Sequence, residues 1–185
     1  LTAAVVARAD AQDGTQQFAS LGAFRLQRGG TLLDCQIGYR TFGTLNAGRS
    51  NAILVPTWFS GTSADLQGFV GAGKLFDSSR YFIVAVDSLG NGVSTSPSNS
   101  GRQPRMQFPA ISIRDMVESE YQLVTGALGL THLKAVVGIS MGGMQAFQWA
   151  TAYPDFMDVV VPIVGSPRLA PFDLVLWHAD RKSTR

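Results

Sequence analysis

The chain has 185 residues, of which 45% are hydrophobic and 15% charged, a composition typical of one globular domain with an appreciable core. Its 15 basic and 13 acidic residues give a formal charge of +2 and are spread along the chain, so there is no basic stripe of the kind that nucleic-acid binding needs. One cysteine, Cys35, and two histidines exclude a disulfide framework and argue against a zinc site, and no stretch approaches the ~18 apolar residues of a membrane span.

Residues 1–17 are predicted to be an N-terminal extension, and residues 18–185 the folded domain. Leu1 to Ala11 carries small residues in A-x-A arrangement after a short apolar run, as the end of a trimmed secretory signal does. An unstructured extension explains the same residues. Export to the periplasm, which the A-x-A pattern favours, and a cytoplasmic location therefore both stay open.

The first half of the domain is predicted to consist of strands. Phe18 to Leu26 and Cys35 to Phe42 flank Gly29-Gly30 and predict an antiparallel hairpin. Two short apolar runs follow, Ala52 to Val55 and Tyr81 to Val86. Each is predicted to be a buried strand that ends in a long loop.

The clearest predicted helix is Ser112 to Leu128, because apolar residues recur there at spacings of three and four. Ser112 followed by Asp115 suits an N-terminal cap. Gly129 is well placed to end the helix.

The rest of the chain alternates between strand and helix. A strand is predicted at Ala135 to Ile139, a helix from Gly142 to about Ala152, and a further strand at Val159 to Val164. This alternation predicts an α/β fold with a mostly parallel sheet and helices on both faces. The sheet is predicted to be truncated after about its sixth strand.

Gly138-Ile139-Ser140-Met141-Gly142 stands between a predicted strand and a predicted helix. This is the layout of a G-x-S-x-G nucleophile elbow, although the pentapeptide by itself also fits a glycine-rich turn. In an elbow the Ser140 hydroxyl stands exposed, and the amide of Met141 can bind a developing oxyanion. The sequence thus predicts covalent acyl transfer by Ser140, with a small-molecule ester or acyl donor as substrate.

A second oxyanion donor should come from the loop after an earlier strand. Pro56 to Gly61 is the candidate loop, and the amides of Phe59 and Met141 would together meet the charge on the tetrahedral oxygen. The alternative is a plain strand-to-loop turn with buried aromatic residues.

No clear acid and base follow Ser140, although a triad in this architecture runs in the order Ser, Asp or Glu, then His. His132 precedes the nucleophile strand, at the end opposite Ser140, and is expected to be structural. His178 is the only other candidate base, but too little chain surrounds it to form the further strands from which acid and base project. The downstream acids close enough in sequence are Asp155, Asp158 and Asp173.

Several stretches resemble the homoserine O-acetyltransferase branch of the α/β-hydrolase superfamily. They are Tyr39 to Asn46, Asp87 to Gly92, Phe108-Pro109 with Ile113 to Val117, and Ser140 to Ala146. The likeness covers about residues 35 to 170 and implies a nucleophile at Ser140 and oxyanion amides at Met141 and Phe59. It implies acetyl-CoA as co-substrate of a transferase, with no bound cofactor, and a catalytic aspartate and histidine beyond Arg185.

Two segments depart from the family pattern. Thr57 to Thr62 is unlike the His-Ala-Leu-Thr-Gly type of loop, and Asn91 to Pro97 lacks the expected arginine. An esterase is therefore as open an interpretation as a transferase, since water or an alcohol can resolve the same acyl-serine. A different hypothesis is a catalytically incomplete half, which pairs with a second copy or a complementing C-terminal chain to cover Val159 to Val164.

Overall fold

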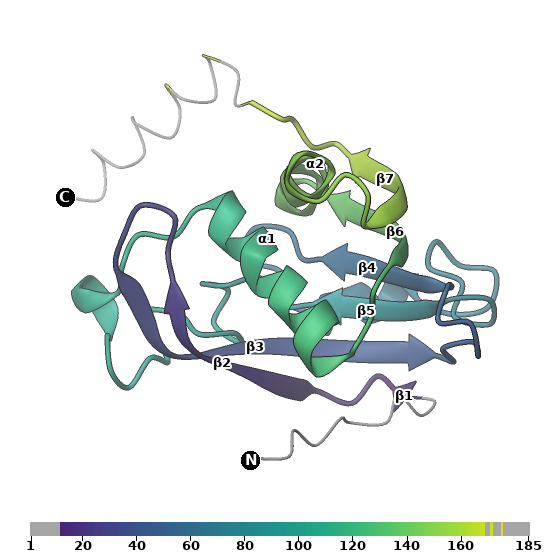
Figure 1. The fold of residues 1–185 in the computed structure, drawn as a ribbon, viewed down its shortest axis with the longest axis horizontal. Helices are drawn as coiled ribbons and strands as arrows, with labels where there is room; N and C mark the ends of the chain where they lie inside the picture. The colour runs from purple at the N-terminus through teal and green to yellow at the C-terminus, as the bar shows by residue number, and fades with distance from the viewer. Residues whose placement is uncertain (1–11, 169–170, 172–174, 176–185) are drawn as a thin grey trace.

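The computed structural model describes residues 12–168, 171 and 175, and in this part of the chain seven strands form one sheet (Figure 1). The strand order is β1-β3-β5-β4-β6-β7, with β2 also paired to β3. The strands are β1 Gln12–Asp13, β2 Gln17–Arg25, β3 Thr31–Gly43, β4 Ala52–Pro56, β5 Phe82–Val86, β6 Leu133–Ile139 and β7 Met157–Ile163. The helical elements are η1 Asp65–Phe69, η2 Arg105–Gln107, α1 Ile113–Gln122, η3 Leu123–Ala127 and α2 Met141–Ala152. None of the described helices has the length and apolarity needed to cross a membrane.

The antiparallel part of the sheet begins earlier in the chain than predicted. The hairpin of β2 and β3 is present, and β1 pairs with the end of β3 through Gln12 and Gly43. Part of the predicted extension of residues 1–17 therefore belongs to the sheet. A strand of two residues is too short to show a hydrophobic period, which is why the sequence gives no sign of it. The possible signal segment at residues 1–11 lies outside the described residues.

The other strands run parallel, as the alternation of strands and helices predicts. β4 pairs in parallel with both β5 and β6, and β6 pairs in parallel with β7. All four therefore have their carboxyl ends at the same edge of the sheet, where the loops after β4, β5 and β6 lie together.

Side chains of the central strands alternate between two cores. Leu54 and Val136 pack with α1 and α2 on one face of the sheet. Val55 and Val137 pack on the other face against the loop that contains η1. The sheet is thus covered on both faces, by the two α-helices on one and by a short 3₁₀ helix with its loop on the other.

The predicted helix at Ser112 to Leu128 changes its winding part-way. A capping box joins Ser112 and Asp115 at its start, as the sequence predicts. After Gln122 the chain continues as the π-helical turn η3, in which the amide of Leu128 donates to the carbonyl of Leu123. Gly129 follows with a φ of +61°, a backbone conformation that glycine adopts without strain and that ends the helix.

Candidate active site

Ser140 alone makes the bend between β6 and α2. Its φ of 56° and ψ of −117° form a backbone conformation that residues with a Cβ atom rarely adopt. The side chain is exposed and makes no capping hydrogen bond to the helix. The strand, sharp bend and helix predicted around Ser140 are therefore present, and Ser140 is exposed at the bend.

Two glycines permit this bend for steric reasons. A Cβ atom on Gly138 would lie 2.0 Å from the carbonyl oxygen of Gly142, because the start of α2 folds back over the end of β6. A Cβ atom on Gly142 would lie 2.5 Å from the carbonyl oxygen of Pro56. The second glycine thus brings the start of α2 against the end of β4, beside the loop that begins at Thr57.

The loop after β4 makes a tight turn at its tip. The amide of Gly61 donates to the carbonyl of Trp58 at 3.0 Å, and Ser60 has a φ of 60°. Trp58 is half-buried, whereas the side chain of Phe59 is 63% exposed. The alternative reading of this loop, a turn with buried aromatic residues, therefore fits Trp58 but not Phe59.

A cavity of about 490 Å³ opens at the carboxyl edge of the parallel strands, and both Phe59 and Met141 line it. Most of its wall is apolar, and Arg105 is the one charged residue in the described lining. The other lining residues are Ser60, Leu89, Gly90, Asn91, Pro97, Phe108, Pro109, Ala110, Ile111 and Met116. The two backbone amides predicted to bind an oxyanion thus belong to residues on the wall of one cavity.

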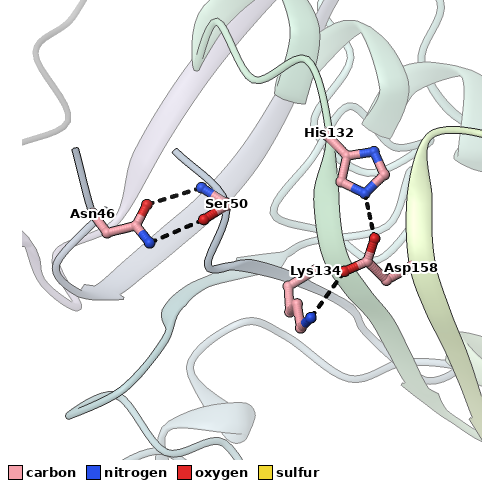
Figure 2. A network of polar contacts seen from close by, with 5 residues as sticks. All are labelled: Asn46, Ser50, His132, Lys134 and Asp158. Atoms are coloured by element: carbon pink, nitrogen blue, oxygen red, sulfur yellow. Dashed lines mark hydrogen bonds and ion pairs between the residues drawn. The ribbon is translucent and has the colours of Figure 1, made fainter. Parts of the chain in front are cut away.

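His132 lies at the opposite end of the sheet, as the sequence predicts. Its Nε2 lies 2.7 Å from Oδ1 of Asp158, whose Oδ2 accepts a hydrogen bond from Nζ of Lys134 at 2.9 Å (Figure 2). These contacts lower the pKa of Asp158, and Asp158 raises the pKa of Lys134. Since β6 and β7 run parallel from Leu133 and Met157 onward, this cluster is a strand length away from Ser140.

The structure identifies no partner base for Ser140 in the described part of the chain. Asp155 is exposed in the turn before β7, at the same end of the sheet as Asp158. The low-ranked candidate base His178 and the acid Asp173 lie outside the described residues. Their positions relative to Ser140 are therefore still predictions from the sequence.

Buried polar residues at the strand ends are a feature that the sequence analysis missed. Asp87 is fully buried directly after β5, where its carboxylate accepts hydrogen bonds from the amide and hydroxyl of Ser63, both at 2.7 Å, and from Gln16 and Asn91, both at 3.0 Å. It thereby joins the loops after β4 and β5. An aspartate immediately after five apolar residues is the signal in the sequence that points to such a position.

A second buried group joins α2 to the same loops. Gln145 is fully buried on α2 and contacts Thr57, the first residue after β4, and Ser88, the second residue after β5. Gln145 is a polar residue on the helix face that also carries the buried Ala146 and Trp149. A polar residue on an apolar helix face was the available signal in the sequence.

Cys35 is fully buried, and burial raises the pKa of its thiol to about 12. It is therefore a neutral side chain of the core and no second nucleophile. In the described residues no group of three or more His, Cys, Asp and Glu side chains could hold a metal ion.

Residues 53–177 match the protein family described as alpha/beta hydrolase fold. The chain belongs to the α/β-hydrolase fold family. This matches the fold predicted from the sequence, and places the bend at Ser140 in a family whose nucleophile stands on a strand-to-helix turn of this kind.

Relatives with similar sequences include proteins named as ester hydrolases and proteins named as homoserine O-acetyltransferases. An ethyl acetate hydrolase of Pseudomonas veronii is 38% identical over 164 residues, which are 88% of this chain and 47% of that protein. A homoserine O-acetyltransferase of Chlorobaculum parvum is 37% identical over 179 residues, which are 92% of this chain and 50% of that protein. The predicted resemblance to the homoserine O-acetyltransferase family is thus confirmed, and a protein named as an ester hydrolase matches with a comparable identity.

The solved structure of an acetylester hydrolase from Corynebacterium glutamicum superimposes with a TM-score of 0.86 at 38% identity. The match covers 89% of this chain and 48% of that one. The chain therefore spans about half the length of the relatives that it matches.

Proposed function

We propose that the protein is an ester hydrolase that acts through an acyl-Ser140 intermediate. The Ser140 hydroxyl attacks the ester carbonyl, the alcohol leaves, and water then releases the acid from the serine. The observation that carries this proposal is an exposed serine on a strained bend, whose next residue, Met141, lines an apolar cavity.

The proposed oxyanion donors are the amides of Met141 and Phe59. Met141 is the first residue of α2, and the first amides of a helix have no partner within it and lie at the positive end of its dipole. Phe59 reaches the same cavity from the loop after β4. Two such donors would stabilise the negative charge of the tetrahedral intermediate more strongly than that of the ground state.

A base is required to remove the proton of Ser140, because a serine hydroxyl alone is a poor nucleophile. The only described histidine, His132, is paired with Asp158 at the opposite end of the sheet. The proposal therefore assigns base and acid to residues outside the described part of the chain. His178 is the candidate within this sequence, and the family resemblance implies a histidine and an aspartate beyond Arg185.

The cavity wall favours a hydrolase over a transferase that uses homoserine. Homoserine carries an ammonium and a carboxylate group and acetyl-CoA carries phosphates, and binding sites for such groups present opposite charges. The described wall offers Arg105 as its one charged residue and is otherwise mostly apolar. This lining suits the uncharged body of a small ester. If the protein is a transferase instead, acetyl-CoA is the expected co-substrate.

The test compares hydrolysis of an aryl acetate with acetyl transfer from acetyl-CoA to homoserine in one series. We expect aryl acetate hydrolysis, and a fall of at least about 10³-fold in kcat for Ser140→Ala. The matched control is Ser50→Ala. Ser50 is an exposed serine just before β4, at the end of that strand opposite the candidate active site. A fluorophosphonate probe should label Ser140 in the wild type; unchanged hydrolysis by Ser140→Ala would refute the proposal.

One observation favours a second candidate, an incomplete half that becomes active with another chain. In the described part of the structure β7 is an edge strand, and Val159 and Val161 on it are 50% and 39% exposed. Exposed apolar edge strands tend to pair with further chains. A complementing C-terminal chain or a second copy would then cover β7 and supply the missing base.

A further inference from the structure

Three buried polar side chains form a closed ring of hydrogen bonds where β4, β5 and α2 meet. The Thr57 hydroxyl donates to Oγ of Ser88 at 3.1 Å, and the Ser88 hydroxyl donates to Oε1 of Gln145 at 3.1 Å. Nε2 of Gln145 completes the ring by donating to the carbonyl of Thr57 at 3.1 Å. All three side chains are fully buried, so no water competes for these bonds.

The ring joins the two segments that carry the proposed oxyanion amides. Gln145 stands one helical turn after Met141, and its Nε2 is also 3.4 Å from the carbonyl oxygen of Met141. Thr57 stands two residues before Phe59 in the loop after β4. Ser88 connects them through its side chain, and its amide donates to the Thr57 hydroxyl at 3.1 Å. Gln145 therefore links the segment before Phe59 to the first turn of α2.

The tip of the loop needs such support because burial does little to hold it. Phe59 and Ser60 are both exposed, and Ser60 has a φ of 60°, a conformation that costs free energy in a residue with a Cβ atom. Beyond the tip, the carbonyl of Gly61 accepts from Nδ2 of Asn91 at 3.0 Å. At the start of the loop, the ring restrains the backbone through the hydrogen bond from Gln145 to the carbonyl of Thr57.

We infer that Gln145 is a positioning residue for the reaction, which holds the loop after β4 at the spacing from the start of α2 that an oxyanion requires. This inference rests on the proposed function. Gln145 touches no substrate atom in this scheme and acts through Thr57 and Met141. Displacing a preorganised donor by about 1 Å can lower a rate by ~10²-fold, so loss of the ring should lower kcat more than it raises KM.

The first test measures kcat and KM for an aryl acetate with Gln145→Met and Gln145→Glu. Met has nearly the size of Gln without its hydrogen bonds, and Glu keeps an acceptor for Ser88 but replaces the two N–H donors of the amide, which reach the carbonyls of Thr57 and Met141, by at most one O–H donor. We expect kcat to fall about 10- to 100-fold in both variants, with KM within about threefold of the wild-type value. The matched control is Gln148→Met, on the same helix, whose amide donates to the hydroxyl of the exposed Thr151.

A second variant, Ser88→Ala, tests the ring if the Gln145 variants do not fold, and hydrogen exchange gives a second measurement on every variant that does fold. Ser88→Ala removes one hydroxyl from the ring and little volume, and should lower kcat in the same direction. In every folded ring variant the amides of residues 57–61 should exchange faster than in the wild type, while those of β6 keep their rates. A purely structural role would lower the stability of the whole domain without this local change.

The outcomes separate the inference from the proposed function. If Ser140→Ala abolishes hydrolysis but a folded Gln145→Met or Ser88→Ala variant matches Gln148→Met in kcat and in loop exchange, the positioning role is refuted and the esterase stands. If Ser140→Ala retains wild-type hydrolysis, the proposed function and the positioning role both fall. Loss of kcat with faster loop exchange supports both.

Discussion

Glu120 shows how a single residue can couple this fold to pH. It is fully buried on α1, its Oε2 accepts a hydrogen bond from Nε1 of Trp149 at 2.7 Å, and its Oε1 has no hydrogen-bond partner among the residues that the structure describes. Burial raises the pKa of this carboxyl group from 4.5 to about 8, against the smaller opposing effect of the Trp149 bond. The side chain is therefore largely neutral at pH 7, and α1 and α2 are joined by a protonated acid.

We predict that Glu120→Gln weakens the pH dependence of stability between pH 5 and 8. The folded state holds its proton up to a pKa of about 8, whereas the unfolded chain releases it near 4.5. The contribution of protonated Glu120 to the free energy of unfolding is thus fully present below pH 4.5. It falls by about 1.4 kcal/mol per pH unit as the pH rises and is lost near pH 8. Gln keeps an acceptor for Trp149 and does not titrate.

The measurement is urea unfolding of wild type and Glu120→Gln at pH 5 and pH 8. The variant should gain stability relative to the wild type as the pH rises. Asp155→Asn, at an exposed position, is the control for a change of one charge. An equal pH slope in wild type and Glu120→Gln would show that Glu120 is already ionised in the fold.

At the scale of elements, the joint of β6 and α2 is set by close backbone approach. The helix begins directly after Ser140, and Gly142 brings its first turn onto the carbonyl of Pro56 at the end of β4. The amide of Ser140 also donates to the carbonyl of Ile163 at 2.9 Å. The bend at Ser140 is thus held between the ends of the two strands that neighbour β6, which are β4 and β7.

Gly142→Ala tests this close approach. The added Cβ atom would meet the backbone oxygen of Pro56 at 2.5 Å, and backbone atoms cannot rotate away as a flexible side chain can. We expect the free energy of unfolding to fall by about 1 to 3 kcal/mol and hydrolysis to weaken, because the loop after β4 must shift.

The control is Gly126→Ala, where a Cβ atom would meet nothing within 4 Å. Its stability should stay equal or rise by up to about 1 kcal/mol, since alanine favours helical backbone. Both variants are compared by urea unfolding and by aryl acetate turnover. If Gly142→Ala behaved like Gly126→Ala in both assays, the contact with Pro56 would not constrain the bend.

At the scale of the whole molecule, the two edges of the described sheet differ. On one side the long β3 is covered by β1 and β2. On the other side β7 is the last described strand, and its exposed Val159 and Val161 stand on the face whose inner part is packed by the loop containing η1. An apolar edge of this kind favours pairing with a further strand or chain.

We predict that the 185-residue chain associates with itself in solution and that Val161→Lys weakens this association. A lysine on an edge strand opposes strand pairing by placing a charge where apolar contact would form. Leu75→Lys, which adds the same charge at another exposed apolar residue, should leave association unchanged. Light scattering over a range of concentrations measures the molar mass in solution and so reports association. A monodisperse wild-type monomer at high concentration would contradict the prediction.

The amino-acid sequence by itself determined the features that depend on neighbours along the chain. Apolar runs located the principal strands, and apolar periodicity located α1. Ser112 and Asp115 gave the cap of α1, and the strand-to-helix layout around Ser140 gave the bend and α2. Each of these follows from backbone sterics and local hydrogen bonding over a few residues, which a short stretch of sequence carries in full.

Only the tertiary structure decided what lies around Ser140. The ring of Thr57, Ser88 and Gln145 joins residues up to 88 positions apart, and its bonds exist because β4 and β5 end, and α2 begins, at one edge of the sheet. The same arrangement buried Asp87 between the loops after β4 and β5, where it contacts Ser63 and Asn91. A sequence records residue types and their spacing, whereas these contacts depend on how parallel strands bring distant segments together.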